Sequence, residues 1–164
     1  MLRNSTPPEP MSAAPHLYID RVFSVNGIVT TVTSTLRGGS VSIGDVMCLY
    51  PGEQKVKVKS IQSYHHARKQ AQSCSRVAMS FRQLKKDTVS RGNCLAPPGA
   101  EITVSREWIV QLMTEVHPLR KQWELEVALG TSHTHARCYL LGGGHLGRLQ
   151  LVRRLPAFGG KRYY

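Results

Sequence analysis

The chain has 164 residues and carries 22 Lys and Arg against 10 Asp and Glu, a formal net charge of +12. This length permits one or two domains and excludes a large multidomain enzyme, and a hydrophobic content of 41% excludes a disordered chain. No apolar run approaches the roughly 18 residues of a membrane span. The excess of positive charge favours a polyanionic partner, of which nucleic acid is the commonest.

The N-terminal part of the chain predicts a linker followed by a β-hairpin. Residues 1–15 contain four prolines and little that could form a core. His16–Val25 and Ile28–Leu36 are rich in β-branched and aromatic residues, and they flank Asn26-Gly27. Both turn residues adopt positive φ at low cost, so the pattern is typical of two strands joined by a tight turn.

Three lysines alternate with apolar residues in the next part of the chain. After a strand over Val46–Tyr50 and a Pro51-Gly52 turn, Lys55, Lys57 and Lys59 are separated by valines. Period-2 alternation places all three lysines on one face of a half-buried strand, where they are candidates for contacts with RNA phosphates. A solvated face and the protection of an exposed sheet edge are the alternatives.

Further short strands extend the β-pattern to the end of the chain. The first set, within residues 16–99, has about enough strands for a six-stranded barrel, and Pro97-Pro98-Gly99 ends it. The remaining strands are expected at Cys74–Phe81, Arg91–Ala96, Trp108–Val116, Trp123–Leu129, Ala136–Leu141 and Arg148–Val152, with a loop or helical turn over Gln83–Ser90. The prediction is an all-β protein of two tandem small β-barrels, 16–99 and 100–164, the second of them incomplete.

The sequence contains no motif typical of an enzyme. It has no G-x-x-x-x-G-K-[ST] phosphate loop, no G-x-G-x-x-G and no nucleophile elbow, and we expect neither catalytic residues nor a metal site. The histidine pairs His65-His66 and His133/His135 lack a third ligand and are interpreted as exposed polar residues. The four cysteines match no zinc spacing, which favours reduced thiols in the cytoplasm. They are Cys48, Cys74, Cys94 and Cys138.

Several segments in order along the chain resemble translational GTPases. Residues 17–45, beginning Leu-Tyr-Ile-Asp-Arg-Val-Phe-Ser-Val, resemble the opening of their domain 2, and the Ile-Asp-Arg-Val-Phe version is most similar to the selenocysteine-specific elongation factors, the SelB family. Residues 56–62, 75–79 and 87–92 resemble later motifs of the same domain, and 101–164 resemble domain 3 more loosely, mainly at 129–132, 136–137 and 161–163. The chain departs from the pattern at Ile28, Ser34 and Ser75.

The resemblance implies a function for the chain as part of a longer factor. SelB-like factors deliver selenocysteyl-tRNA to the ribosome for UGA recoding, and their domain 2 binds the aminoacyl end of the tRNA. GTP and Mg²⁺ are then bound by the factor's own GTPase domain and not by this chain, which is expected to be no enzyme, to act in the cytoplasm and to contact no membrane. The alternatives are the equivalent segment of elongation factor Tu or of initiation factor 2 gamma, and a basic β-barrel module that binds protein.

The resemblance also implies a selenocysteyl-binding site at Asp20, Arg21 and Arg76. Selenocysteine is ionised at neutral pH, whereas a free thiol titrates near ~8.5, so a selective site should present cations in a partly desolvated pocket. Asp20 would orient an arginine and keep other anions out. Neighbours on a regular strand face opposite sides, so Asp20 and Arg21 can share a pocket only at a bulge or a strand end.

Overall fold

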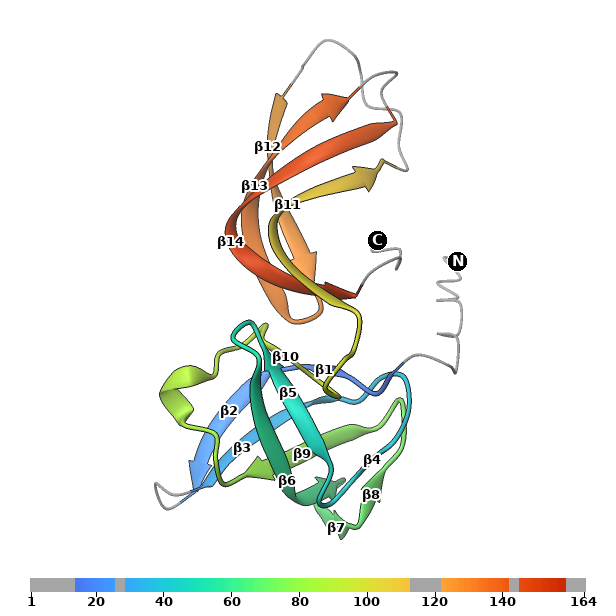
Figure 1. Ribbon diagram of the computed structural model, residues 1–164, viewed down its shortest axis with the longest axis vertical. Helices are drawn as coiled ribbons and strands as arrows, with labels where there is room; N and C mark the ends of the chain where they lie inside the picture. Colours follow the sequence, from blue (N-terminus) through green and yellow to red (C-terminus); the bar gives the residue numbers. More distant parts are fainter. Residues whose placement is uncertain (1–13, 26–28, 113–121, 142–144, 159–164) are drawn as a thin grey trace.

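The structure, a computed structural model, describes residues 14–25, 29–112, 122–141 and 145–158. These residues form almost entirely β-structure, with one short 3-10 helix among them, η1 (Lys86–Thr88), so the all-β prediction is confirmed. Two units, each built on a curled sheet, follow one another along the chain (Figure 1). No helix within the described ranges is long and apolar enough to cross a membrane.

The first unit is an eight-stranded antiparallel sheet accompanied by a two-stranded one. Its strands are β1 (Leu17–Tyr18), β2 (Arg21–Val25), β3 (Val29–Thr35), β4 (Val41–Ser42), β5 (Val46–Tyr50), β6 (Gln54–Ser63), β7 (His66–Arg68), β8 (Gln70–Ala71), β9 (Arg76–Phe81) and β10 (Cys94–Ala96). Hydrogen-bonded neighbours follow the order β1-β10-β5-β6-β9-β3-β2, with β7 beside β6 and β4 beside β8. The two ends of this path, β1 and β2, are consecutive in the chain, so the sheet curls into a barrel whose seam lies at Ile19 and Asp20.

The single strand expected over His16–Val25 is wrong, because the chain changes partner at the seam. β1 pairs with β10, whereas β2 pairs with β3. Between them, the amide of Ile19 donates to Asn93 O (2.8 Å) and the amide of Asp20 donates to Thr33 O (3.0 Å). The β2–β3 pairing itself is the predicted hairpin, and its Asn26-Gly27 turn lies outside the described residues.

Two further predicted strands begin later than expected, and both differences have backbone causes. β9 begins at Arg76 and not at Cys74, because Cys74 has φ +65°, a left-handed conformation that a strand does not contain. β10 begins at Cys94, after a turn in which Gly92 has φ +88°. The short strands β4, β7 and β8 were not predicted from the sequence.

Strand β6 shows the alternation that the sequence predicts. Val56 and Val58 are each 1% exposed and point into the barrel, while the three lysines between and beside them are exposed. β6 pairs with both β5 and β9. The pairing with β5 covers Gln54–Lys57 and the pairing with β9 begins at Val58, so the printed pairings of Lys55 and Lys57 are with β5 alone. Protection of a sheet edge by these lysines therefore stays a prediction.

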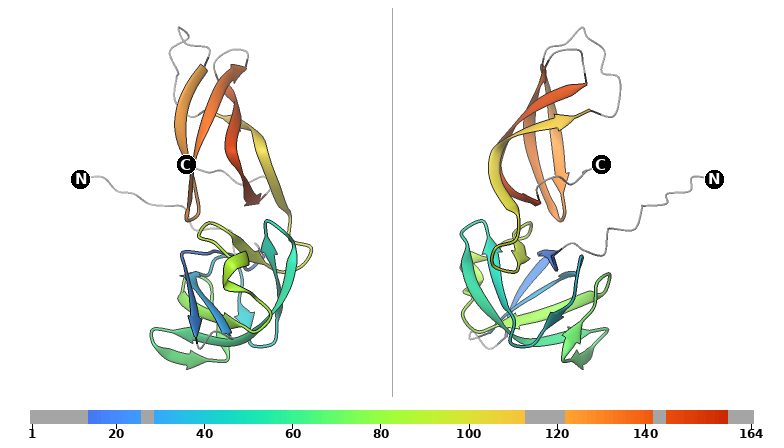
Figure 2. Two further views of the ribbon diagram at one scale, coloured as in Figure 1. Left: turned by 90° about the vertical axis from the view of Figure 1, so that its left-hand side faces the viewer. Right: turned by 45° about the vertical axis from the view of Figure 1, so that its right-hand side comes forward.

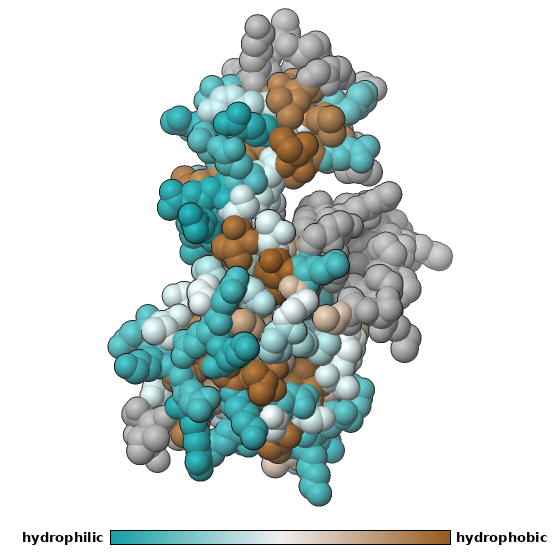
Figure 3. Space-filling view, in the orientation of Figure 1, coloured by the Kyte–Doolittle hydropathy of each residue, from teal (hydrophilic) through white to brown (hydrophobic). Residues whose placement is uncertain are grey.

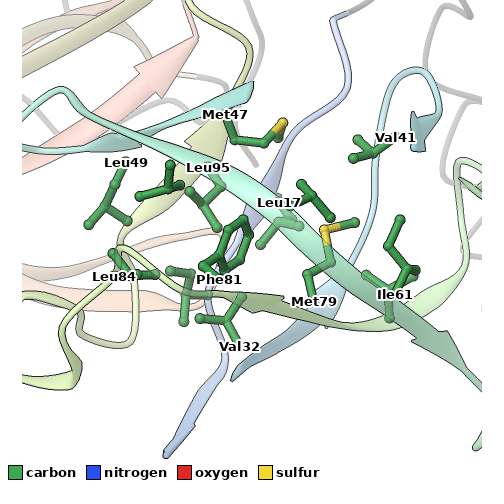
Figure 4. Packing of buried hydrophobic residues seen from close by; sticks show 14 of the residues in the cluster. Leu17, Val32, Val41, Met47, Leu49, Ile61, Met79, Phe81, Leu84 and Leu95 are labelled. Carbon is green, nitrogen blue, oxygen red and sulfur yellow. The ribbon is translucent and has the colours of Figure 1, made fainter. Parts of the chain in front are cut away.

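The core of the first unit is a continuous cluster of aliphatic and sulfur-containing side chains around Phe81 (Figure 4). Phe81 and Met79 on β9 are fully buried and meet Ile61 from β6 and Leu95 from β10. Burial of this kind stabilises by roughly 1.5–3 kcal/mol for each large side chain. Ile19 at the seam is part of this core.

The second unit is a four-stranded antiparallel sheet in the order β11-β14-β13-β12. Its strands are β11 (Ile102–Gln111), β12 (Gln122–Leu129), β13 (Ser132–Leu141) and β14 (Leu146–Phe158). The strand expected over Trp108–Val116 is part of β11, which begins six residues earlier than predicted, and its residues beyond 112 lie outside the described ranges. The motif at 161–163 lies outside them as well.

A second apolar cluster joins the two units. Tyr18, Tyr50 and Cys94 from the first unit pack with Leu151 and Leu155 from the second. The Tyr18 hydroxyl donates to Pro156 O at 3.1 Å. Burial, with a hydrogen bond to Cys48 adding to it, raises the pKa of Tyr50 to about 12, so this phenol stays neutral in the junction. Figure 2 shows the lower ends of β12, β13 and β14 meeting the first unit near β1 and β10.

Candidate functional site

The seam of the first barrel carries Asp20 and Arg21, two of the three site residues predicted from the resemblance. Asp20 lies between the strands and Arg21 is the first residue of β2. This is a strand end, the geometry in which two neighbours need not face opposite sides. Arg76 is the first residue of β9 and pairs with Thr35 on β3, two residues beyond the partner of Arg21.

Asp20 and Arg76 meet in a direct ion pair. The Arg76 guanidinium donates to Asp20 Oδ2 at 2.6 Å, and Arg91 Nε lies 4.0 Å from Asp20 Oδ1. The side chain of Asp20 is 21% exposed, while those of Arg76 and Arg91 are more than half exposed. The hydrogen bond from Arg76 lowers the pKa of Asp20, partial burial opposes this, and the charges of Arg76, Arg91 and Arg21 add to the lowering. Asp20 is therefore ionised at neutral pH and leaves an excess of positive charge around it.

A cavity of about 200 Å³ lies beside this ion pair. Its lining combines both partners of the pair, one further cation and small polar groups: Tyr18, Asp20, Ser34, Thr35, Arg37, Arg76, Gly130 and Thr131. The volume is below the roughly 300 Å³ at which pockets for drug-sized ligands begin, so it suits a small polar or anionic group. Arg21 is not part of the lining.

The cavity is built from both units of the chain. Thr131, from the turn between β12 and β13, donates its hydroxyl to Ile19 O at 2.6 Å, and Arg91 Nε donates to Thr131 O at 2.9 Å. The Ser34 hydroxyl donates a hydrogen bond to Tyr18 O and so connects β3 to β1. Ser34 is one of the residues that depart from the family pattern. Arg91 thus links the carboxylate at the seam to the backbone of the second unit.

Two glycines allow the units to approach this closely. A Cβ on Gly130 would lie 2.2 Å from Tyr18 Cγ, and one on Gly92 would lie 2.5 Å from Ser132 Oγ. Both glycines have positive φ, +58° and +88° respectively. No other residue fits either position without displacing its neighbour across the junction.

Sequence reasoning did not identify Arg37, Arg91 and Thr131 as parts of the site. Arg91 and Thr131 lie in two segments that carry the resemblance, 87–92 and 129–132. The resemblance marks both segments but does not indicate that they lie side by side. Nothing in the sequence marks Arg37, which follows the end of β3 and pairs with His16 in an isolated bridge. The contacts come from the packing of the two units.

The other predicted candidates lie away from this cavity. Lys55, Lys57 and Lys59 are exposed on β6 and take no part in its lining. His133 Nδ1 lies 3.4 Å from Glu126 Oε1, both side chains being more than half exposed. Within the described residues no group of three metal-ligating side chains gathers.

A larger cavity, of about 420 Å³, lies on the exposed face of the second sheet. Its charges are balanced, since two arginines, Arg106 and Arg137, and two glutamates, Glu107 and Glu124, line it. Arg137 Nε lies 3.5 Å from Glu124 Oε1. Balanced and exposed charges select no particular ligand, so the smaller cavity is the better candidate site despite its size.

Comparisons with known proteins find elongation factors that are similar to most of this chain. The chain is 30% identical over 112 residues to elongation factor 1-alpha of Pyrobaculum calidifontis, covering 68% of this chain and 25% of that protein. It is 33% identical over 131 residues to the selenocysteine-specific elongation factor of Haemophilus influenzae, covering 76% of this chain and 20% of that protein. No protein-family model matches the chain.

Solved structures show the same fold. The elongation factor SelB of Methanococcus maripaludis superimposes with a TM-score of 0.77 in its apo form and 0.80 with a GTP analogue, at 18% identity in both. These matches cover 89% and 98% of this chain and 38% and 39% of the solved chains. The chain spans about a quarter or less of the length of the curated relatives reported above. The chain is therefore similar to part of the translation elongation factors and has the fold of the matched part of SelB.

Proposed function

We propose that this chain is the part of a selenocysteine-specific elongation factor that holds the aminoacyl end of selenocysteyl-tRNA. The observation that carries the proposal is the small cavity in which the paired Asp20 and Arg76 lie beside Arg37. The similarity to the selenocysteine-specific factor of Haemophilus influenzae supports it, because the aligned region covers three quarters of the chain.

The charge of the cavity suits a selenolate better than a hydroxyl. A selenolate carries its charge at neutral pH, and guanidinium groups remain protonated and offer several donors to one anion. Asp20 accepts one hydrogen bond from Arg76, so other donors of this guanidinium can bind an anion, and the Asp20 carboxylate repels anions placed next to it. A serine hydroxyl is neutral at pH 7 and would gain no charge–charge attraction from Arg76 and Arg37.

The remainder of the cycle is assigned to other parts of the longer protein. The sequence contains no phosphate loop, so we propose that GTP and Mg²⁺ are bound outside these 164 residues and that this chain performs no hydrolysis. The factor's GTPase domain, the tRNA and the ribosome are its partners, in the cytoplasm. Both halves of the chain carry positive charge, as a surface along a tRNA requires.

A second candidate is an aminoacyl-end site without preference for selenocysteine. It is favoured by the similarity to elongation factor 1-alpha, which extends over 112 residues. Under this alternative the Asp20–Arg76 pair stabilises the barrel seam and takes no part in reading the amino acid.

Protection of the aminoacyl ester from hydrolysis distinguishes the two candidates. The 164-residue chain is mixed with selenocysteyl-tRNA or with seryl-tRNA on the same tRNA body, and the rate of deacylation is measured for each. Slower deacylation of selenocysteyl-tRNA alone supports the proposal, and equal protection of both supports the second candidate. Protection of neither, with no binding of tRNA at low salt, would favour a protein-binding module.

A further inference from the structure

Arg91 lies in a tight turn that is fixed to the seam of the first barrel. Asn93 N donates to Ser90 O at 3.1 Å, and Ser90 N donates to Asn93 Oδ1 at 2.7 Å. Arg91 and Gly92 lie between them, and the φ of Gly92, +88°, suits the second central position of a turn. Gly92 N donates to Ile19 O at 2.9 Å, and Ile19 N donates to Asn93 O at 2.8 Å. The backbone of Arg91 is therefore held directly beside the seam.

The second unit holds the side chain of Arg91. Arg91 Nε donates to Thr131 O at 2.9 Å, and the Thr131 hydroxyl donates to Ile19 O at 2.6 Å. Ile19 O thus accepts one hydrogen bond from each unit. The shared apolar cluster lies at this junction, and Figure 3 shows hydrophobic and neutral residues where the two units meet in this view. Arg91 adds a charged group to the junction, and its bond to the second unit determines where that charge lies.

The charge of Arg91 acts on Asp20 and not on the cavity directly. Arg91 Nε lies 4.0 Å from Asp20 Oδ1, whereas the Arg76 guanidinium donates to Oδ2. Arg91 is not part of the lining of the small cavity, while Asp20 and Arg76 both are. The Nε–H of Arg91 is used by Thr131 O, so the interaction with Asp20 is electrostatic. Any effect of Arg91 on a group bound in the cavity therefore passes through another residue.

Two arginines share one carboxylate, and this changes the charge that the cavity presents. If Asp20 were balanced by Arg76 alone, the two would form a neutral pair, and a neutral pair attracts an anion weakly. With Arg91 near the second carboxylate oxygen, the group of three carries a net positive charge. Arg76 then keeps more of its attraction for an anion in the cavity.

We propose that Arg91 is a positioning residue of the small cavity, which holds a positive charge beside Asp20 and so strengthens the attraction of Arg76 for a selenolate. This inference rests on the proposed function, since it names a residue that adjusts the same site. The hydrogen bond to Thr131 O makes the choice of amino acid depend on the docking of the second unit as well. A residue that served the docking alone would need this hydrogen bond but no charge.

Three variants of the 164-residue chain separate the charge of Arg91 from its hydrogen bond. Arg91→Gln removes the charge and keeps a donor for Thr131 O, while Arg91→Lys keeps the charge. Arg153→Gln is the matched control. Arg153 donates to His133 O at 2.9 Å, beside the same turn of the second unit, and it is not among the charges that act on Asp20.

The rates of deacylation of selenocysteyl- and seryl-tRNA are measured with each variant. Arg91→Gln should reduce the preference for selenocysteyl-tRNA about two- to fivefold, the size expected for loss of one exposed charge interaction. Arg91→Lys should restore most of the preference, and Arg153→Gln should leave it unchanged. Equal losses in both Arg91 variants would overturn the proposal, because the hydrogen bond and not the charge would then be required. An unchanged preference in Arg91→Gln would overturn it as well, as would an equal loss in the control.

A second measurement needs no tRNA and separates failure of this inference from failure of the proposed function. The pKa of Asp20, followed by NMR of its side-chain carboxyl carbon, should rise in Arg91→Gln and stay low in Arg91→Lys and Arg153→Gln, because the charge of Arg91 contributes to its lowering. No amino-acid preference in the unaltered chain, with this response of the pKa, would overturn the proposed function. A preference in the unaltered chain without a response of the pKa in Arg91→Gln would overturn the role of Arg91 alone. Arg91 is more than half exposed, and urea unfolding of each variant shows that it is folded.

Discussion

The Asp20–Arg76 pair gives the stability of the chain a pH dependence that can be isolated. The folded-state pKa of Asp20 lies below its ordinary value of 3.8. Ionised Asp20 therefore stabilises the fold above that pH, and its contribution is lost as the pH falls through the folded-state pKa. In a double-mutant cycle of Asp20→Asn and Arg76→Gln, we expect a coupling free energy of about 0.2–1 kcal/mol near pH 7, since Arg76 is half exposed.

Urea unfolding of the four proteins near pH 7 and at about pH 3 measures this coupling, which should shrink at the lower pH. The Glu124–Arg137 pair is the matched control, because both of its side chains are more exposed and lie 3.5 Å apart. A coupling that stayed constant down to the lower pH would show that the two residues interact through packing and not through charge.

The two predicted arginines should differ in their effect on amino-acid selection. Arg76 lines the cavity and Arg21 does not. Arg76→Ala should therefore reduce the preference for selenocysteyl- over seryl-tRNA by about tenfold, as loss of one charge-assisted hydrogen bond of ~1.5 kcal/mol implies. Arg21→Ala should reduce it less, and Arg148→Ala, an exposed cation of the second unit, should leave it unchanged. The ester-protection assay measures all three, and an Arg21→Ala effect equal to that of Arg76→Ala would contradict this ranking.

At the scale of elements, the turn glycines lie close to the other unit, and this predicts that adding a side chain there destabilises the fold. Gly130→Ala should destabilise the chain by about 1–3 kcal/mol more than Gly99→Ala, because its new methyl group would meet the Tyr18 ring. Gly99 is a suitable control, since it also has positive φ, +83°, but has no atom within 4 Å of the position of a Cβ. Urea unfolding measures both variants, and equal losses would mean that backbone conformation and not contact requires Gly130.

The sequence predicts elements well where local pattern and tertiary pairing agree. β5 was predicted with its observed bounds and β6 was predicted around its three lysines, because lysines and valines alternate along β6 and Pro51-Gly52 separates the two strands. The break at Ile19 was missed, because the apolar pattern continues through it and the change of partner is decided by Asn93 and Thr33, which are distant in the chain. Strands of two or three residues, such as β4 and β8, are too short to show a period.

The candidate site was predicted only in part, because its residues are also distant from one another in the chain. The resemblance named Asp20 and Arg76 but could not supply the distance between them, which the β2–β3–β9 pairing sets. Arg91 and Thr131 enter the site through contacts between residues 40 apart. Contacts across a junction leave no periodic pattern in the sequence of either segment, so the structure was needed to identify them.

At the scale of the whole molecule, the cavity depends on the junction between the units, because residues of both units line it. The shared apolar cluster and the bonds from Tyr18, Arg91 and Thr131 cross the junction. We therefore expect the chain to unfold in one cooperative transition and not as two independent barrels. Both tryptophans, Trp108 and Trp123, belong to the second unit, and Trp108 packs against the junction cluster, so their fluorescence reports the unfolding of that unit and of the junction.

Hydrogen exchange of the β6 and β9 amides reports the first unit, and its denaturant midpoint should coincide with that of tryptophan fluorescence. Leu155, 2% exposed in the junction, provides the decisive variant. Leu155→Ala should cost about 2–5 kcal/mol by leaving a cavity between the units, and it should separate the two midpoints. Val152→Ala, an exposed change three residues earlier on β14, should do neither. Two midpoints in the unaltered chain would show that the barrels fold separately, and the cavity would then depend on their docking and not on folding.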